Sequence, residues 1–309
     1  MAAKLYNGDL MKTVLSCMAG LIMSVSLALP SIASSKPEPL ASMRLLKDES
    51  GPIKVRSKSE NGVSLRVVFD TAAASSILFE HGRTTGVGDR LEQDQYVYFP
   101  FTDRILDFRQ LGFFTLKLGD HRFSSNSWVY GPWKSTGLFP GRNEPNYDVI
   151  AGRDVFINFA VAVDPKKRRV RLYESGQDLS SRYDTSVDII DLNPLMGVKV
   201  TVSRADTGEL SEKLMIVDTG FPGVLLFADD QELEELKADE FTAPADTIGN
   251  ALIAPGRIKL GDLPFKEHTA LVVSKGAFEA DGIIGTSFLA NYSYAFDLLE
   301  KKLYLTELR

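Results

Sequence analysis

Two aspartates in this 309-residue chain follow runs of mostly apolar residues that are typical of buried strands. Asp218 follows residues 214–217 and begins the tripeptide Asp-Thr-Gly, whereas Asp70 follows residues 65–69 and begins Asp-Thr-Ala. A carboxylate at the end of a buried strand is costly unless it is hydrogen-bonded or takes part in chemistry. Two such acids in one chain suggest a pair, although a single aspartate of this kind is more often a structural cap of a loop.

An internal repeat relates the two aspartates, because three blocks of sequence recur in the same order. One matching block would easily arise by chance, but three collinear blocks would not. The repeat therefore predicts two copies of one all-β unit, at residues 50–177 and 178–309, with a polar boundary between them. The repeated blocks are residues 148–174 and 281–307, residues 117–120 and 259–262, and the Asp-Thr dipeptides at positions 70 and 218.

The elements that must position the two acids are short strands. Apolar or alternating segments bounded by glycine, proline and polar residues predict an all-β, two-lobed fold with few short helices. Residues 147–156 and 281–289 each predict a buried strand, a glycine turn and a short helix, and residues 229–237 predict a surface helix. The other predicted strands span residues 53–56, 63–69, 113–118, 123–130, 160–164, 170–173, 198–202, 214–217, 224–227, 258–260 and 270–273.

An aromatic segment at residues 96–101 follows a predicted loop at residues 82–94. Tyr96 and Tyr98 have two interpretations. They either pack as part of one more strand or belong to a mobile flap that presents an aromatic ring to a substrate. A further Asp-Thr-Gly at residues 206–208 lies among polar residues, and we interpret it as a hairpin tip.

The first 33 residues have the pattern of an export signal. Two lysines precede an apolar run over residues 14–29, and small residues follow it, with either Met1 or Met11 as the start. The alternative to a cleaved signal is a membrane anchor, because the run is only slightly shorter than a bilayer span. We expect an exported protein, periplasmic or secreted, with a flexible leader at residues 34–49.

Composition places the chain among ordinary globular proteins, with 44% hydrophobic and 25% charged residues. The only cysteine, Cys17, lies inside the signal, so the mature chain is expected to lack disulfides. Removal of the signal takes two of the 35 cations and one of the 41 anions, which leaves a net charge of −7. No basic cluster stands out, and nucleic acid is therefore not an expected partner.

The sequence resembles the pepsin/retropepsin-like aspartic protease family, in a bacterial-looking form with both lobes in one chain. The resemblance is carried by Asp-Thr-Ala at residues 70–72, by Asp-Thr-Gly at residues 218–220, and by the apolar segments that end at Gly152 and Gly285. It covers essentially the whole mature chain, and its second half is the stronger match.

The resemblance implies that each lobe gives one aspartate, Asp70 or Asp218, to a catalytic dyad. Aspartic proteases are the reference case for two carboxylates that share one proton. The ionised member would take a proton from water while the protonated member binds the scissile carbonyl oxygen. This mechanism implies no covalent intermediate, metal or cofactor, and the three histidines (His81, His121 and His268) form no metal-ligand spacing. The implied partner is a peptide or an unfolded protein, bound by a monomer.

The same resemblance implies roles for the residues around the dyad. Thr71 and Thr219 would lock the two acid loops through reciprocal hydrogen bonds to the backbone. Gly220 would let the backbone approach the carboxylates. The strands that end at Gly152 and Gly285 would cross behind the acids in ψ-shaped loops.

Three positions depart from the family pattern. Ala72 stands where the family usually has glycine, and its methyl group would crowd the acid loop if the backbone there needed a positive φ. Ala73 and Phe221 lack the hydroxyl that can stabilise an ionised aspartate, so we expect higher dyad pKa values and an activity optimum nearer neutral pH. The alternative function is a non-catalytic peptide-binding protein of the cell envelope on the same scaffold.

Overall fold

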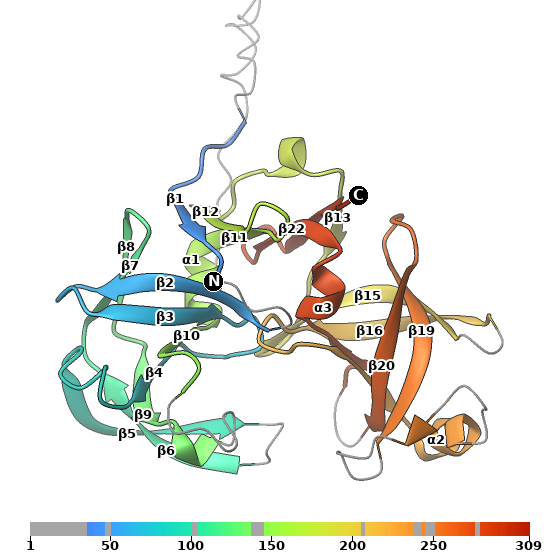
Figure 1. The fold of residues 1–309 in the computed structure, drawn as a ribbon, viewed down its shortest axis with the longest axis horizontal. Coiled ribbons are helices and arrows are strands. Elements are labelled where there is room, and N and C mark those ends of the chain that lie inside the picture. Colours follow the sequence, from blue (N-terminus) through green and yellow to red (C-terminus); the bar gives the residue numbers. More distant parts are fainter. Residues whose placement is uncertain are drawn as a thin grey trace, which may run out of the picture. The chain divides into compact units, whose positions relative to one another are not determined.

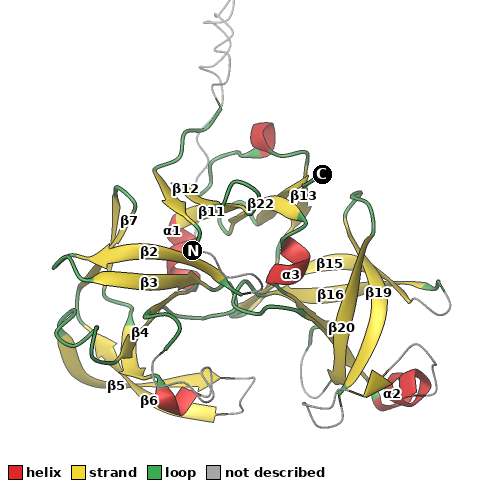
Figure 2. Ribbon diagram, in the orientation of Figure 1, coloured by secondary structure: helices red, strands yellow, loops and turns green. Residues whose placement is uncertain are grey.

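Short strands form three sheets in the computed structural model, and helices are few (Figures 1 and 2). The predicted export signal, with Cys17, lies outside the described residues. In the part of the chain that is described, no helix combines the length and apolar character needed to cross a membrane. The described residues are 36–46, 51–99, 104–136, 145–204, 208–237, 243–244, 251–275 and 279–309.

A nine-stranded sheet is built from the first half of the chain, with the strand order β5-β6-β9-β4-β10-β3-β2-β7-β8. Most of its strands pair in antiparallel fashion, but β10 runs parallel to β3. Its strands are β2 (Ile53–Ser59), β3 (Ser64–Phe69), β4 (Ile77–Glu80), β5 (Arg90–Phe99), β6 (Arg104–Leu111), β7 (Phe114–Leu118), β8 (His121–Ser125), β9 (Val129–Pro132) and β10 (Val149–Ala151).

An eight-stranded sheet repeats this arrangement in the second half, with the order β14-β15-β16-β21-β17-β20-β19-β18 and an additional pairing of β15 with β19. Here β21 runs parallel to β16, as β10 does to β3. Its strands are β14 (Ile190–Leu192), β15 (Leu195–Arg204), β16 (Leu210–Val217), β17 (Val224–Ala228), β18 (Ala243–Pro244), β19 (Leu252–Leu260), β20 (Lys266–Ser274) and β21 (Gly282–Ile284).

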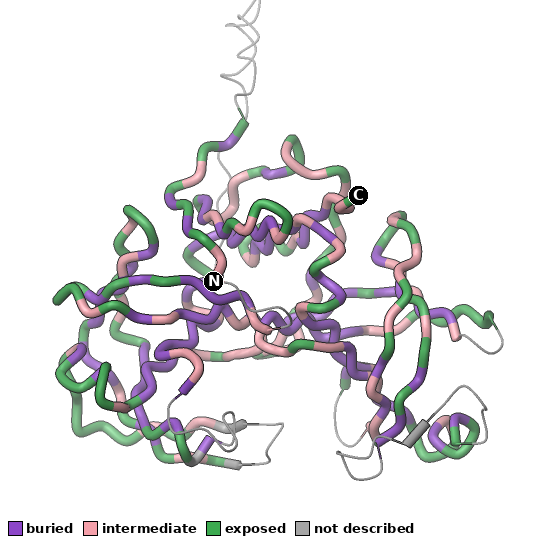
Figure 3. The backbone as a smooth tube through the Cα atoms, in the orientation of Figure 1, coloured by how far each residue is buried: buried purple, intermediate pink, exposed green. Residues whose placement is uncertain are grey.

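A six-stranded sheet, ordered β1-β12-β11-β22-β23-β13, takes strands from both halves. Every residue of β11 is buried, as expected for a central strand covered on both faces. The main apolar core runs through both halves, and Figure 3 shows buried stretches in all three sheets. The strands are β1 (Ala41–Arg44), β11 (Phe159–Asp164), β12 (Arg169–Glu174), β13 (Thr185–Asp188), β22 (Tyr292–Asp297) and β23 (Lys302–Glu307).

Three α-helices occur among the described residues: α1 (Arg153–Asn158), α2 (Asp230–Lys237) and α3 (Thr286–Leu289). Helices α1 and α3 directly follow the glycine turns, where the sequence predicts them. Helix α2 is the predicted surface helix, and the Asp229 side chain caps it by accepting the Glu232 N–H at 2.8 Å. Two 3₁₀ turns, Lys134–Thr136 and Ser180–Arg182, are also present in the described part of the chain.

The sequence predictions for the β5–β6 region are wrong in two respects. The loop predicted over residues 82–94 ends early, because β5 begins at Arg90, and β6 was not predicted. Apolar Leu91 and Ile105 are exposed on this hairpin among polar residues, so the segment lacks the strict alternation of apolar and polar residues that identifies a strand. The strand predicted over residues 123–130 is two strands, because β8 ends at Ser125 and β9 begins at Val129, where the chain moves to pair with β4 and β6.

Part of the predicted leader at residues 34–49 is ordered as β1, which pairs with β12. Ala41 and Met43 are buried while Ser42 and Arg44 are exposed, an alternation too short to identify from sequence. Strands β13 and β14 were also missed. The boundary predicted at residue 177 stays a prediction.

Candidate active site

Each of the two aspartates lies directly after a strand whose parallel neighbour holds it. In the first half, the Asp70 N–H donates to the Ala151 carbonyl of β10 at 3.0 Å. In the second half, the Asp218 N–H donates to the Ile284 carbonyl of β21, also at 3.0 Å. The strand that precedes each glycine turn therefore fixes the end of the strand that carries the acid.

Backbone amides of the acid loops hold both carboxylates. Asp70 Oδ1 accepts hydrogen bonds from the N–H groups of Ala72 at 2.9 Å and Ala73 at 3.1 Å. Asp218 Oδ1 accepts from the two residues at the same places in its own loop, at 2.7 and 3.0 Å. Because one oxygen of each carboxylate is bound in this way, both side chains have a fixed orientation.

Reciprocal hydrogen bonds between Thr71 and Thr219 join the two acid loops. The Thr219 N–H donates to Thr71 Oγ1 at 3.0 Å, and the Thr71 N–H donates to Thr219 Oγ1 at 3.1 Å. The Thr71 hydroxyl donates to the Val217 carbonyl and the Thr219 hydroxyl to the Phe69 carbonyl, each at 2.7 Å. Both threonines are buried, so these bonds satisfy groups that water cannot reach.

The two carboxylates meet beside Gly220. A Cβ atom added to Gly220 would lie 2.7 Å from Asp70 Cγ and 3.1 Å from Asp218 Oδ1. Ala72 carries a methyl group at the equivalent place in the first loop. Among the described residues, Ala72 is not one of those with a positive φ, so the alanine does not strain the backbone.

The electrostatic environments of the two acids differ. Burial raises the pKa of Asp70, although the amides of Ala72 and Ala73 oppose this effect. Burial raises the pKa of Asp218 well above its ordinary value, and the nearby charge of Asp70 raises it further. Because the two carboxyls interact, they titrate as a pair, and burial raises the pKa of both members.

Close packing explains the glycines of the two ψ-loops. A Cβ atom on Gly152 would lie 2.7 Å from the Ala73 carbonyl oxygen, and one on Gly285 would lie 2.6 Å from the Gly223 carbonyl oxygen. These distances leave no room for a side chain behind either acid loop. The Gly152 N–H donates to Ser76 Oγ at 2.9 Å, and the Gly285 N–H donates to the Gly223 carbonyl at 2.8 Å.

Tyr96 lies on the β5–β6 hairpin with 73% of its surface exposed. Neighbouring strand residues point to opposite faces, and Val97 packs with the apolar cluster that contacts the first acid loop at Ala73. Tyr96 therefore points to the other face of the hairpin. For Tyr98 only the backbone is described, paired with Ile105. The flap role of both tyrosines stays a prediction.

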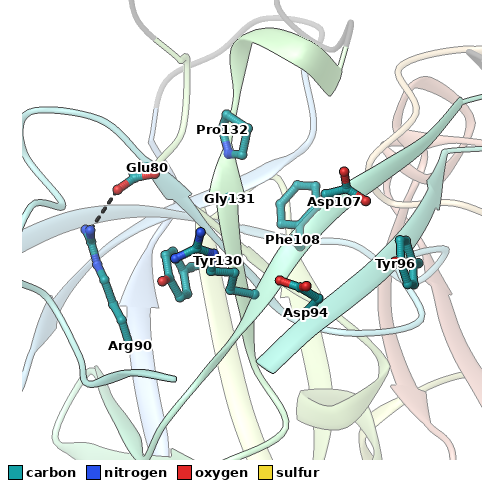
Figure 4. Close-up of a pocket in the computed structure, with 10 residues that line it drawn as sticks. Glu80, Arg90, Asp94, Tyr96, Asp107, Phe108, Tyr130, Gly131 and Pro132 are labelled. Atoms are coloured by element: carbon teal, nitrogen blue, oxygen red, sulfur yellow. Dashed lines mark hydrogen bonds and ion pairs between the residues drawn. The ribbon is translucent and has the colours of Figure 1, made fainter. Parts of the chain in front are cut away.

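A pocket of about 480 Å³ lies on the face of this hairpin that Tyr96 shares (Figure 4). Charged side chains dominate its lining, and Arg90 forms an ion pair with Glu80 at 2.7 Å. None of its lining residues belongs to the two acid loops. The lining consists of Glu80, Arg90, Asp94, Tyr96, Asp107, Phe108, Arg109, Tyr130, Gly131 and Pro132.

Two residues near the dyad escaped the sequence analysis. Tyr147 lies two residues before the ψ-loop strand β10, and burial together with the charges of both dyad acids raises its pKa far above the ordinary value. Arg153 reaches from α1 to the second half, where it donates to the Pro194 carbonyl at 2.8 Å and lies 3.1 Å from Asp191 Oδ2. The repeat could not reveal either residue, because Ala280 and Thr286 occupy the equivalent positions.

Asp148 anchors the ψ-loop strand from outside the site. Its carboxylate accepts the Arg66 N–H at 2.7 Å, pairs with the Arg66 guanidinium at 3.0 Å, and lies 2.9 Å from His81 Nε2. Its repeat partner Asp281 accepts the Leu214 N–H at 2.9 Å in the same way. In the described ranges, no group of three histidine, cysteine or acidic side chains could hold a metal ion.

Comparison with known proteins identifies the fold. No protein-family model matches the sequence, and no curated protein is similar to it in sequence. Among solved structures, the chain is similar to an aspartic proteinase from Irpex lacteus, with a TM-score of 0.57 and 13% identity over 86% of this chain and 96% of that one. It is also similar to the basic 7S globulin from soybean, with a TM-score of 0.55 and 10% identity over 87% of this chain and 95% of that one. The chain therefore has the pepsin-like fold.

Proposed function

We propose that the protein is an aspartic endopeptidase that hydrolyses peptide bonds with a water molecule activated by Asp70 and Asp218. The observation that carries the proposal is the joining of the two acid loops by Thr71 and Thr219 at 3.0 and 3.1 Å. These bonds keep two buried carboxyls adjacent, and nothing in ordinary folding requires so costly an arrangement.

The asymmetry of the pair supports distinct roles for the two acids. Asp70, the more readily ionised member, accepts a proton from the attacking water. Asp218, whose pKa is raised further, holds the shared proton and donates a hydrogen bond to the carbonyl oxygen of the scissile bond. Water attacks the carbonyl carbon directly, so the chain itself forms no covalent bond to the substrate.

A second candidate is a peptide-binding protein without catalytic activity. The methyl group of Ala72 favours it, because at the equivalent position of the second loop, Gly220, a Cβ atom would lie only 2.7 Å from Asp70 Cγ. The likeness to a globulin as well as to a proteinase also leaves activity unassigned, because identities of 10 and 13% indicate the fold alone.

Parallel measurements of binding and cleavage distinguish the two functions. The purified protein is mixed with an unfolded, fluorescently labelled protein across pH 3 to 8, and both anisotropy and fragment release are recorded. An endopeptidase releases fragments, and Asp218→Asn abolishes release while binding persists. Binding without fragments at every pH would support the second candidate.

Export and a periplasmic or secreted location remain part of the proposal, because the signal lies outside the described residues.

A further inference from the structure

A run of positive charge occupies the turn between β11 and β12 and the first residues of β12. Five of the six residues from Lys166 to Arg171 are lysine or arginine, in a chain whose net charge is −6. The sequence prediction of no basic cluster is therefore wrong for this segment. The run was missed because the segment was interpreted only as a turn followed by a strand.

Pairing with β1 adds another cation to the same face of the six-stranded sheet. Arg44 lies directly opposite Arg169 in the antiparallel register, and Arg171 follows two residues further along β12. The residues between these arginines, Met43 and Val170, are buried, so the three arginines share the outer face at the β1 edge (Figure 1). Like charges directly opposite each other destabilise a sheet. None of the three forms an ion pair within the described residues, so folding alone does not explain why they are gathered there.

A pocket of about 440 Å³ lies beside these arginines, and Arg171 is part of its lining. Its other cations are Lys167 and Arg182, which face the acids Glu38 and Asp164. Lys167 lies 3.5 Å from Asp164, but three cations against two acids leave the pocket positive. Together with the exposed cations of the turn and the sheet edge, the pocket forms a basic patch, which consists of Arg44, Lys166, Lys167, Arg169, Arg171 and Arg182.

Arg182 has an unused hydrogen-bond donor at this pocket. Its guanidinium stacks over the Tyr173 ring, 5.3 Å from the ring centroid, and donates to the Pro37 carbonyl. These two contacts fix the guanidinium, yet its Nε–H is buried and has no acceptor among the described residues. A buried donor without a partner is destabilising. A phosphate oxygen is an acceptor that matches a guanidinium in both charge and geometry.

The chain reaches the basic patch directly from its predicted export signal or anchor. The apolar run ends at Leu29, and Lys36, seven residues later, is the first described residue. A connection of this length extends over about 25 Å at most. Leu40, which follows the pocket residues Glu38 and Pro39, is apolar but 44% exposed. The adjacent apolar run and the exposed leucine favour a bilayer over other polyanions as the partner of this patch.

We propose that the basic patch binds the surface of a bilayer that contains anionic phospholipids, and that the pocket beside Arg182 receives one lipid phosphate. Guanidinium groups donate paired hydrogen bonds to phosphate oxygens, and Leu40 supplies an apolar contact at the level of the headgroups. Each lysine or arginine held at an anionic surface strengthens binding about fivefold. This attachment does not depend on the dyad, and it suits an endopeptidase and a peptide-binding protein equally.

Partitioning of the full chain onto vesicles provides the test. Vesicles of neutral phosphatidylcholine are compared with vesicles that also contain phosphatidylglycerol, and bound protein is measured by flotation at low and high salt. The readout is the ratio of the two partition coefficients, because the apolar run is common to all variants and binds both kinds of vesicle. Thermal unfolding shows that each variant is folded.

Three variants change the patch, and one matched variant changes charge elsewhere. Arg44→Gln with Arg169→Gln removes two exposed charges from the patch, Arg44→Lys with Arg169→Lys keeps them, and Arg171→Gln alters the pocket. The control is Lys199→Gln with Lys237→Gln, which removes two exposed charges from the second half of the chain.

We expect the wild type to favour anionic vesicles, and the double glutamine variant of the patch to lower this preference by about 10-fold or more. Arg171→Gln should lower it about fivefold. The lysine variant and the control should keep it, and high salt should remove it.

The proposal is overturned if the wild type does not distinguish the two kinds of vesicle, or if the control lowers the ratio as much as the patch variants do. Binding of a short DNA duplex without a preference for anionic vesicles would assign the patch to nucleic acid and would also overturn it. Cleavage plays no part in this readout, so failure of the proposed hydrolysis would leave the result unchanged.

Discussion

Ala162 of β11 lies directly opposite Ala295 of β22 in the six-stranded sheet, and the two alanines occupy the same position of the internal repeat. A residue that pairs with its own repeat copy marks the local twofold axis that relates the halves. The dyad obeys the same relationship, because Thr71 and Thr219 exchange equivalent hydrogen bonds. Departures from this symmetry therefore identify the residues that make the two halves of the site different.

The bonds between the acid loops predict a large effect of Thr219→Val, which keeps the shape but removes the hydroxyl. The Thr71 N–H loses its acceptor and the Phe69 carbonyl its donor, and both groups are buried. We expect a loss of about 1–3 kcal/mol in the free energy of unfolding for each unsatisfied group. Urea denaturation measures the change, and Thr219→Ser, which keeps the hydroxyl, serves as the control. Equal stability of the valine and serine variants would contradict the role of the hydroxyl.

The two loops should respond differently to matched substitutions between glycine and alanine. Ala72→Gly relieves no strain. It should lower the free energy of unfolding by about 0.4–1 kcal/mol, because glycine increases the entropy of the unfolded chain. Gly220→Ala introduces a Cβ atom 2.7 Å from Asp70 Cγ, so the carboxylates must move apart. Activity should fall on the order of 100-fold, as for other small misplacements of reacting groups. Kinetics of both variants check this, and an active Gly220→Ala enzyme would show that the dyad tolerates separation.

The Asp148 cluster predicts a loss of stability in acid. Burial alone would raise the pKa of Asp148, but hydrogen bonds and charge from Arg66, together with Arg83, outweigh it and hold the pKa below the ordinary value of 3.8. The stabilisation is therefore present above that pH and is lost as the pH falls through the lower folded-state pKa. Asp148→Asn should lower the free energy of unfolding by about 1–3 kcal/mol at pH 7, and by progressively less below pH 4.

Urea denaturation between pH 2 and 7 measures this difference. Asp188→Asn is the control, because Asp188 forms an exposed ion pair with Lys302 that water and salt screen, so its loss should change stability little. A destabilisation by Asp148→Asn that did not change with pH would exclude a contribution from the ionised carboxylate.

The dyad predicts the opposite dependence on pH. Because the folded-state pKa of Asp218 is raised above 3.8, its contribution to stability is complete below that pH and is lost as the pH rises through the folded-state pKa. Asp218→Asn removes the ionisable group, so the variant should gain stability over the wild type between pH 4 and 8. Thermal unfolding across this range checks the prediction, and a constant difference between the two proteins would refute it.

Sequence reasoning recovered what the repeat and the strand pattern encode. The all-β fold is confirmed, and the segments 147–156 and 281–289 form the strands, glycine turns and helices expected of them. The hairpin strand β6 was missed, because apolar Ile105 is exposed beside Asp107 and Arg109, so apolar and polar residues do not alternate strictly along it. Tyr147 was missed for another reason: its repeat partner is Ala280, so only the folded chain reveals its position near both acids.

The pH dependence of kcat/KM for a peptide substrate, measured for the wild type, Asp70→Asn and Asp218→Asn with Asp188→Asn as the control, tests the central claim most directly. A shared dyad predicts a bell-shaped profile for the wild type, with its maximum nearer neutral pH than pH 3 because both carboxyls have raised pKa values. Both dyad variants should lose activity at every pH, whereas the control should keep the wild-type profile. Substantial activity in either dyad variant, or a wild type without activity from pH 3 to 8, would contradict the proposed catalytic role of Asp70 and Asp218.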